Sequence, residues 1–352
     1  MSSNFCSKTN KYNYIINKIN NNDIDYIEFV DFDNLQIKNI CNILKNNKSV
    51  NKIYIENNFD FINSLSDLIK NNKNITELCL RFCDNIKNLT PLGKALEINT
   101  SLKKLSLLYN KNIKSFDPIF KALKINNGLE ELIINTCLRK DNYVLKYSDM
   151  NLLSEALKFN TSLKILDLSD NYIEDLTFIN KALKNNSNLK IINLTSNYIK
   201  DITPLSEALK VNNSLKELLL MENYIEDLTS LSEALKVNTN LKELYLSKNI
   251  IKDLTPLNEA LKVNKGLKIL DLSENEEISF IKPLCEALKY NNTLIELNLD
   301  GCEEITDIKS LYDALKVNNS LKKLCISEDI LDEELEYFEE IAEEKTIKLE
   351  YY

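Results

Sequence analysis

The 352-residue sequence contains no histidine and only four glycines, and both shortages exclude common kinds of site. Without an imidazole, the chain cannot carry a Ser-His-Asp triad, a Cys-His dyad or an HExxH zinc site. The glycines are isolated from one another, so neither GxGxxG nor GxxxxGK[ST] occurs. We therefore expect a protein that is not an enzyme of these kinds and that binds no nucleotide through a glycine-rich loop.

Charge and apolar runs narrow the range of partners. The chain has 44 Lys+Arg against 53 Asp+Glu, and its net charge of −9 has the wrong sign for a general binder of nucleic acid. No stretch approaches roughly 18 consecutive apolar residues, and the first 23 residues lack the apolar run of a signal peptide. We expect a soluble, cytoplasmic protein that contacts neither nucleic acid nor a membrane.

The eight cysteines are too sparse for a disulfide framework and too scattered for a zinc site. None forms a CxxC motif, and a zinc site without histidine would need about four clustered thiolates. We expect all eight to be reduced thiols, and we expect no metal and no cofactor.

One motif repeats along nearly the whole chain, at steps of 25 to 27 residues apart from one step of 34. Its clearest copies are LKILDLSDNYIEDL, LKELLLMENYIEDL and LKELYLSKNIIKDL. Each of the twelve copies begins with an apolar residue, here called the anchor, from which the other positions are numbered. The anchors are Ile24, Val50, Ile75, Leu102, Leu129, Leu163, Leu189, Leu215, Leu241, Leu267, Leu294 and Leu321.

Each copy changes its apolar period once. In LKELYL, Leu244 and Leu246 alternate with Glu243 and Tyr245, which predicts a short strand with one buried face. In PLSEALKV, the second part of an earlier copy, Leu205, Ala208 and Leu209 recur at i, i+3 and i+4, which predicts a short helix with one apolar stripe. One strand and one helix cannot bury their apolar sides alone, so the copies must stack on one another.

The expected helices have recurring residues at both ends. All five prolines occupy one phase, mostly behind Thr or Asp, and we interpret the preceding residue as the N-cap and proline as the first helical residue. They are Pro91, Pro118, Pro204, Pro256 and Pro283. Asparagine at the other end is interpreted as a left-handed stop. These asparagines are Asn126, Asn212, Asn238, Asn264 and Asn318.

The pattern LxxLxLxxNxI with a helix in each copy resembles the leucine-rich repeat, and the tail ALKVNxxLKxL resembles its ribonuclease-inhibitor-like subfamily. The units of 26–27 residues are shorter than is usual there. The Asn or Cys of the pattern stands at Asn58, Cys83, Asn110, Cys137, Asn171, Asn197, Asn223, Asn249, Asn275 and Cys302. The resemblance implies an α/β fold, a right-handed curved solenoid of about 12 repeats with a parallel β-sheet on the concave face and short helices on the convex face.

The repeats divide the chain into three parts. Residues 24–327 form the predicted leucine-rich repeat solenoid. Residues 1–23 are predicted to be an N-terminal cap with a short helix, and residues 328–352 an acidic C-terminal cap with a helix and a last strand.

Positions +2, +4, +6 and +7 of each copy are expected to project from the concave face, where solenoids ordinarily bind. Apolar candidates for partner binding are Tyr54, Phe82, Leu108, Tyr109, Ile133, Leu219, Met221 and Tyr245. Acidic candidates, which would steer a partner with a basic patch, are Asp167, Asp170, Glu217, Glu222, Glu243, Asp271 and Glu274.

We interpret the protein as a non-catalytic scaffold that binds a partner protein on this concave face. Two alternatives stay open: a GTPase-activating or other regulator of a small GTPase, and a substrate-recognition adaptor for a ubiquitin ligase. The sequence leaves the oligomeric state open. It also marks an insertion at residues 138–148, basic and aromatic in composition, as either a tolerated loop or a binding loop.

Overall fold

The structure is a computed structural model that describes residues 8–30, 32–56, 61–135, 147–327 and 335–350. Strands and helices alternate along these residues. The strands are β1 (Tyr26–Val30), β2 (Lys52–Glu56), β3 (Glu77–Arg81), β4 (Lys104–Leu108), β5 (Glu131–Asn135), β6 (Ile165–Asp167), β7 (Ile191–Asn193), β8 (Glu217–Leu219), β9 (Glu243–Tyr245), β10 (Ile269–Asp271), β11 (Glu296–Leu299), β12 (Lys323–Ile326) and β13 (Lys348–Glu350).

The helices follow the strands one by one. They are α1 (Lys8–Asn20), α2 (Asn34–Leu44), α3 (Ile62–Asn71), α4 (Thr90–Leu96), α5 (Asp117–Leu123), α6 (Tyr147–Phe159), α7 (Thr177–Leu183), α8 (Thr203–Leu209), α9 (Thr229–Val237), α10 (Thr255–Val263), α11 (Lys282–Leu288), α12 (Ile308–Val317) and α14 (Leu335–Lys345).

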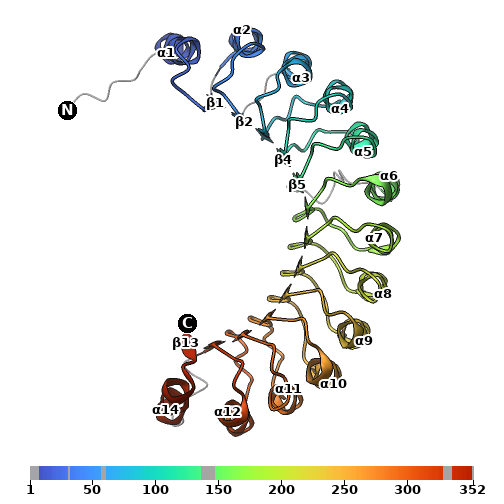
Figure 1. The fold of residues 1–352 in the computed structure, drawn as a ribbon, viewed down its shortest axis with the longest axis vertical. Helices are drawn as coiled ribbons and strands as arrows, with labels where there is room; N and C mark the ends of the chain where they lie inside the picture. Colours follow the sequence, from blue (N-terminus) through green and yellow to red (C-terminus); the bar gives the residue numbers. More distant parts are fainter. Residues whose placement is uncertain (1–7, 31, 57–60, 136–146, 328–334, 351–352) are drawn as a thin grey trace, which may run out of the picture. The chain divides into compact units, whose positions relative to one another are not determined.

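The chain divides into two compact units, residues 1–171 and residues 172–352. Strands β1 to β6 of the first unit and β7 to β13 of the second are parallel and lie in the order of the sequence. In each unit taken by itself, Figure 1 shows the strands along the inner side of an arc and the helices along its outer side. The predicted α/β repeat fold, with a parallel sheet and helices on opposite faces, is confirmed.

The core is a stack of equivalent leucines. Leu218, Leu244 and Leu270 are register partners on β8, β9 and β10, and all three have no exposed surface. Because each copy places its anchor and its +3 and +5 residues at the same depth, the repeats within each unit bury their apolar faces against one another.

The asparagines at position +8 join neighbouring repeats through their side-chain amides. Asn249 donates from Nδ2 to the carbonyl of Leu220 one repeat earlier (3.0 Å), and its Oδ1 accepts from the backbone N–H of Ile225 (3.0 Å). Cys302 occupies the same position and donates its thiol to the carbonyl of Leu272 (3.3 Å). A small donor at this position therefore satisfies a buried carbonyl, as the repeat pattern predicts; Asn58 and Cys137 lie outside the described residues.

A second row of asparagines lies at the C-terminal ends of the helices, three residues before each anchor. Asn264 donates to the carbonyls of Leu235 (2.7 Å) and Asn238 (2.9 Å) in the preceding repeat. Its Oδ1 accepts from the N–H groups of Gly266 (2.9 Å) and Leu267 (2.8 Å). The same pattern is made by Asn72, Asn99, Asn126, Asn160, Asn212, Asn238 and Asn318.

This bonding corrects the predicted role of these residues. Asn238, Asn264 and Asn318 do end their helices, but their backbones are extended rather than left-handed, with φ of −80°, −64° and −72°. Asparagine is needed here because its amide is both donor and acceptor, and glycine could not replace it.

The predicted helix starts are wrong by one step. Thr255 is the first residue of α10 rather than its N-cap, and Pro256 is therefore the second. The cap comes from two residues earlier, where Asp253 Oδ1 accepts from the Thr255 N–H (2.8 Å). Asp175, Asp201 and Asp227 do the same for α7, α8 and α9. Aspartate readily bonds to a backbone N–H two residues on, which fixes the turn that leads into the helix.

Replacement of Asn264 by alanine tests the second asparagine row. Two carbonyls and two N–H groups would lose their buried partner, so we expect the free energy of unfolding to fall by about 3 kcal/mol. Urea unfolding followed by circular dichroism measures the change. Asn292→Ala, at an exposed asparagine one residue beyond the row, is the control and should stay within about 0.5 kcal/mol of wild type. Equal losses in both variants would contradict a structural role for the row.

Candidate functional site

The strand face is defined here as positions +2, +4, +6 and +7 of the repeats in one unit. Within β8, Leu218 is buried while Glu217 and Leu219 on either side are half-buried and project outward. All fifteen residues that the sequence proposes for partner binding lie on the strand face of their own unit, and none of them is buried. Glu222 and Glu274 are exposed and the others half-buried.

In the first unit, the strand face carries a compact aromatic cluster. The rings of Phe82 and Tyr109 stack with centroids 5.1 Å apart and an angle of 15° between their planes. The Arg81 guanidinium lies 4.8 Å from the Phe82 centroid and 5.8 Å from that of Tyr109. Leu108 is the register partner of Arg81 and lies beside the cluster. Arg81 was not proposed from the sequence. Two features could have indicated it: arginine is rare in this chain, and Arg81 directly precedes Phe82.

The two stacked residues have an unusual backbone. Position +7 is left-handed in both units, with φ of 52° at Phe82 and 55° at Tyr109. In the second unit this position is held by small, flexible or polar residues, including Ser196, Glu222 and Gly301. Bulky residues are uncommon in this conformation. Two aromatic rings are therefore held here against the backbone preference of their residue type.

Three more predicted residues of the first unit, Tyr54, Ile133 and Asp167, lie in the +4 row. The row runs in register through Tyr54, Cys79, Ser106, Ile133 and Asp167. Tyr54 packs edge-on against the Tyr26 ring at 6.4 Å. Burial and the neighbouring Glu77 raise the pKa of its hydroxyl.

The two acids predicted in the first unit have partners within the chain. Asp167 Oδ1 accepts from the backbone N–H of Ser169 (2.9 Å) and from its hydroxyl (2.6 Å). Asp170 Oδ2 accepts from Asn135 Nδ2 (2.6 Å). Their carboxylates are therefore less available to a partner than the sequence suggests.

In the second unit, two half-buried glutamates of the +2 row face each other. Glu217 and Glu243 are register partners on β8 and β9. Burial first, and the charge of Glu243 second, raise the pKa of Glu217. Tyr245 donates its hydroxyl to Glu243 Oε2 (2.8 Å), and burial together with this carboxylate raises the pKa of Tyr245.

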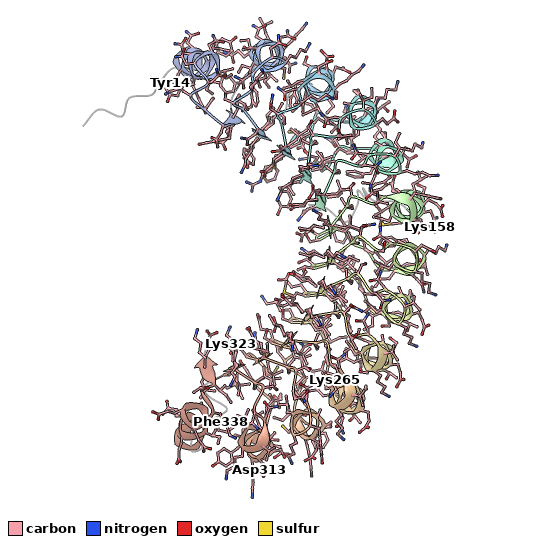
Figure 2. All side chains as sticks on the ribbon, viewed as in Figure 1. Tyr14, Lys158, Lys265, Asp313, Lys323 and Phe338 are labelled. Atoms are coloured by element: carbon pink, nitrogen blue, oxygen red, sulfur yellow. The ribbon has the colours of Figure 1, made fainter. Side chains whose placement is uncertain are left out.

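Elsewhere in the +2 row, neighbouring charged residues have opposite signs, and the uncharged positions include Ile165, Ile191 and Ile269. Lys52 lies 3.6 Å from Glu77, Lys104 lies 2.7 Å from Glu131, and Lys323 lies 2.9 Å from Glu296. Figure 2 shows Lys323 on the strand side of its unit, opposite the outer side where Asp313 lies. Like charges placed directly opposite each other in a sheet are destabilising. The Glu217–Glu243 pair is thus a local departure from the charge pattern of the same row.

The other three acids predicted in the second unit, Glu222, Asp271 and Glu274, interact with neighbouring side chains. Lys248 lies 3.8 Å from Glu222 and 3.4 Å from Glu274, at the same position of neighbouring repeats. Asp271 Oδ1 accepts from the N–H (3.0 Å) and hydroxyl (2.6 Å) of Ser273. The sequence proposal therefore overlooked Lys248, which neutralises part of the expected acidic surface.

Apolar side chains adjoin the two facing glutamates. Leu219 and Tyr245 are neighbours in the +4 row, and Met221 at +6 is half-buried. The strand face of the second unit thus combines half-buried carboxylates with apolar groups. Across the described parts of the chain, no group of Cys, Asp and Glu side chains could hold a metal ion.

Two further expectations meet the described residues only in part. The insertion proposed at 138–148 lies outside them except for its last two positions. No disulfide joins the six cysteines in the described part of the chain, and no helix there is long and apolar enough to cross a membrane.

Comparisons with known proteins agree with this repeat geometry. Residues 161–207 match the family model described as leucine-rich repeats in two copies. This segment consists of leucine-rich repeats. The match covers β6 to α8, where the +8 asparagines and the Asp caps of the helices recur. No curated protein sequence matches the chain.

Solved structures resemble the chain in fold. The crystal structure of an internalin from Listeria monocytogenes str. 4b F2365 is 18% identical with a TM-score of 0.54, covering 93% of this chain and 86% of its own. TLR13, in the TLR13-ssRNA13 complex, is 19% identical with a TM-score of 0.53, covering 86% of this chain and 47% of its own. At these identities the likeness establishes the leucine-rich-repeat fold and nothing narrower.

Replacing Glu217 with glutamine should stabilise the protein near pH 7. The folded-state pKa of Glu217 is raised, so the wild-type protein loses stability as pH rises from the unfolded-state pKa through the folded-state pKa. Glutamine removes this loss, and we expect a gain of about 0.2–1 kcal/mol in the free energy of unfolding. Urea titrations should show the gain at pH 7 and its disappearance below about pH 4, where both states are protonated.

The matched variant is Glu296→Gln, in the same row. Glu296 pairs with Lys323 at 2.9 Å, so its replacement should leave stability at pH 7 unchanged or lower it. A gain in both variants would mean that removal of any carboxylate from this acidic protein stabilises it, and that the facing glutamates are not special.

Proposed function

We propose that the strand face binds partner proteins without catalysis, and that each unit contributes its own patch. Leucine-rich repeats are typical scaffolds for protein–protein interaction, which supports the general class. The ribonuclease-inhibitor-like subfamily remains part of the proposal, because a helix follows the strand in the repeats as it does in that type. The narrower content comes from the chemistry of the two patches.

The observation that carries the proposal is the pair Glu217–Glu243. Two half-buried carboxylates side by side cost stability, whereas the same row elsewhere places lysine opposite glutamate. A lysine or arginine side chain from a partner would complete the alternation here. Leu219 and Tyr245 next to the pair would cover the aliphatic stem of that side chain. The patch therefore fits a partner that presents a basic residue on an apolar surface.

The patch of the first unit is the cluster of Arg81, Phe82 and Tyr109. Aromatic and arginine side chains dominate the energetics of protein interfaces. Aromatic rings bury large areas with few rotatable bonds, and the planar guanidinium of arginine stacks on them while offering five N–H donors. The fold sets a left-handed backbone at position +7 in both units, but it does not require an aromatic residue there, since serine, glutamate or glycine serves at this position elsewhere. Bulky side chains in this conformation carry strain, and such strain is more often found at binding sites than elsewhere.

Glu217→Lys tests the patch of the second unit. The new lysine lies opposite Glu243, so the fold keeps or gains stability, while a basic side chain of a partner is repelled. We expect proteins captured from a lysate of the source cells to be depleted at least about tenfold, as counted by quantitative mass spectrometry. The control Glu304→Lys makes the same change of charge at an exposed glutamate between β11 and α12, at position +10 and outside the strand face, and should capture the wild-type set. If both baits recover equal amounts, the acidic pair does not bind the partner.

Phe82→Asn together with Tyr109→Asn tests the patch of the first unit. Asparagine favours the left-handed conformation, so the thermal transition should hold while the stacked rings are removed. We expect the loss of at least about 2 kcal/mol of binding free energy for any partner held by this patch. Ser196→Asn, at position +7 of the second unit, is the control for asparagine at such a site. Unchanged affinity in the double variant would place the partner elsewhere.

A further inference from the structure

A third surface, away from the strand face, carries an exposed apolar row. It lies where each helix ends and the chain turns toward the next strand, four residues before the anchor. In the second unit the row consists of Val211, Val237, Val263, Tyr290 and Val317, which are 51 to 67% exposed. Isolated apolar residues on a surface need no explanation, but here the same position is apolar and exposed in five successive repeats.

The fold does not require an apolar residue at this position. Asn46, Asn71 and Asn185 occupy it in three other repeats and are equally exposed there. Val211 and its equivalents also gain nothing from helix propensity, because β-branched residues are poorer helix formers than lysine or glutamate. The row is therefore retained for something other than packing within the chain.

The lysines next to the row form ion pairs along their own helices. Lys210, one residue before Val211, is paired with Glu207 one turn back along the helix (2.7 Å). The same i, i+3 pair recurs between Lys236 and Glu233 (2.6 Å). Further pairs join Lys262 with Glu259 and Lys289 with Glu286, and the Lys262 ammonium also lies 5.7 Å from the ring centroid of Tyr290. These pairs neutralise the helix side of the row, and Lys262 covers part of the Tyr290 ring.

The strand side of the row is basic. Position +1 holds Lys216, Lys242 and Lys268 in three successive repeats, and Lys216 Nζ donates to the uncharged Asn240 Oδ1 (3.3 Å). Lys242 Nζ donates to the carbonyl of Thr239 (2.9 Å), on the turn that follows Val237, and to that of Gly266 (3.2 Å), on the turn that follows Val263. Burial and the charges of the two neighbouring lysines lower the pKa of Lys242. Figure 2 shows Lys265, on the turn that also holds Gly266, between the strands and the helices of this unit.

We propose that this lateral edge, formed by the row from Val211 to Val317 and by Lys216, Lys242 and Lys268, docks an acidic amphipathic segment of a partner protein. Apolar side chains of the segment cover the valines, and its carboxylates pair with the lysines. The edge is basic within a chain of net charge −9, so attraction is local to it. The inference is independent of the strand face.

The surroundings favour a protein segment over an anionic bilayer. Glu207 and Glu233 lie one helical turn behind Val211 and Val237, and a bilayer broad enough to cover the valines would also meet these carboxylates. Valine also inserts into membranes less effectively than the Trp, Phe and Leu of interfacial helices. A segment one helix or strand wide can follow the valine and lysine rows without meeting the glutamates.

The probe is a displayed library of random 16-residue peptides selected on the full chain, with selected peptides then titrated by biolayer interferometry. We expect enrichment of sequences that alternate Asp or Glu with apolar residues. Binding should weaken at least about tenfold for Val211→Asn/Val237→Asn/Val263→Asn, which copies Asn185, and again for Lys242→Glu. It should also weaken as salt rises.

Two controls separate this edge from other surfaces. Ile98→Asn/Ile125→Asn removes apolar residues of the same position in the first unit, where Lys103 is paired with Glu130 (3.3 Å), and should bind the peptides as wild type does. Glu217→Lys on the strand face should also bind the peptides normally. The two proposals are therefore tested separately, because either surface can fail to bind while the other binds.

Three results would overturn the proposal. The first is selected peptides that lack the acidic and apolar pattern or bind the triple valine variant with wild-type affinity. The second is co-sedimentation of the protein with phosphatidylserine vesicles that the triple variant loses, which would make the occupant a membrane. The third is self-association in analytical ultracentrifugation that the same variant abolishes, which would make it a second copy of the chain.

Discussion

Within each unit, buried asparagine amides connect neighbouring repeats, and the rest of the fold depends on that connection. Parallel stacking leaves carbonyls and N–H groups at both ends of every strand and helix that no sheet hydrogen bond reaches. Asn249 satisfies such groups at the end of the strands, and Asn264 satisfies them at the end of the helices. A buried polar group without a hydrogen-bond partner is costly. Each repeat is therefore stable only in the register that satisfies the polar groups of its neighbour. The apolar core supplies most of the driving force, and the amides fix the register.

The sequence predicted the strands, the helices and the outward positions because an apolar residue that recurs at the same position in twelve copies indicates a buried position in each of them. It failed where one residue type has two possible uses. Thr255 and Asp253 are both good caps, and only the backbone geometry shows that the aspartate is the one that bonds. Asn264 looks like a left-handed helix stop, and its bonds to another repeat involve residues that local sequence does not bring together.

The candidate site shows the same limit. Its positions followed from the period of two, but the state of each charge depends on what stands one repeat away. Glu222 was proposed as a steering acid and is paired with Lys248, whereas Glu217 faces a second glutamate. Listing residues along the chain does not show which row they share. The stacked rings of Phe82 and Tyr109 were named singly, and their contact with each other and with Arg81 came only from the structure.

The side-chain amides of the asparagines at position +8 also determine how such a protein can change its length. Asn223 and Asn249 bond to equivalent carbonyls, each belonging to the repeat before its own. If one whole copy is lost, from one anchor to the next, the asparagine amide of the following copy meets an equivalent carbonyl, so the same kind of hydrogen bond forms. If half a copy is lost, the amide donors have no carbonyl in reach. Gene rearrangements that keep the repeat intact are thus tolerated by the backbone, and they move Glu217, Lys248 and the valine row as blocks. New surfaces can arise by reordering copies without a single new contact in the core.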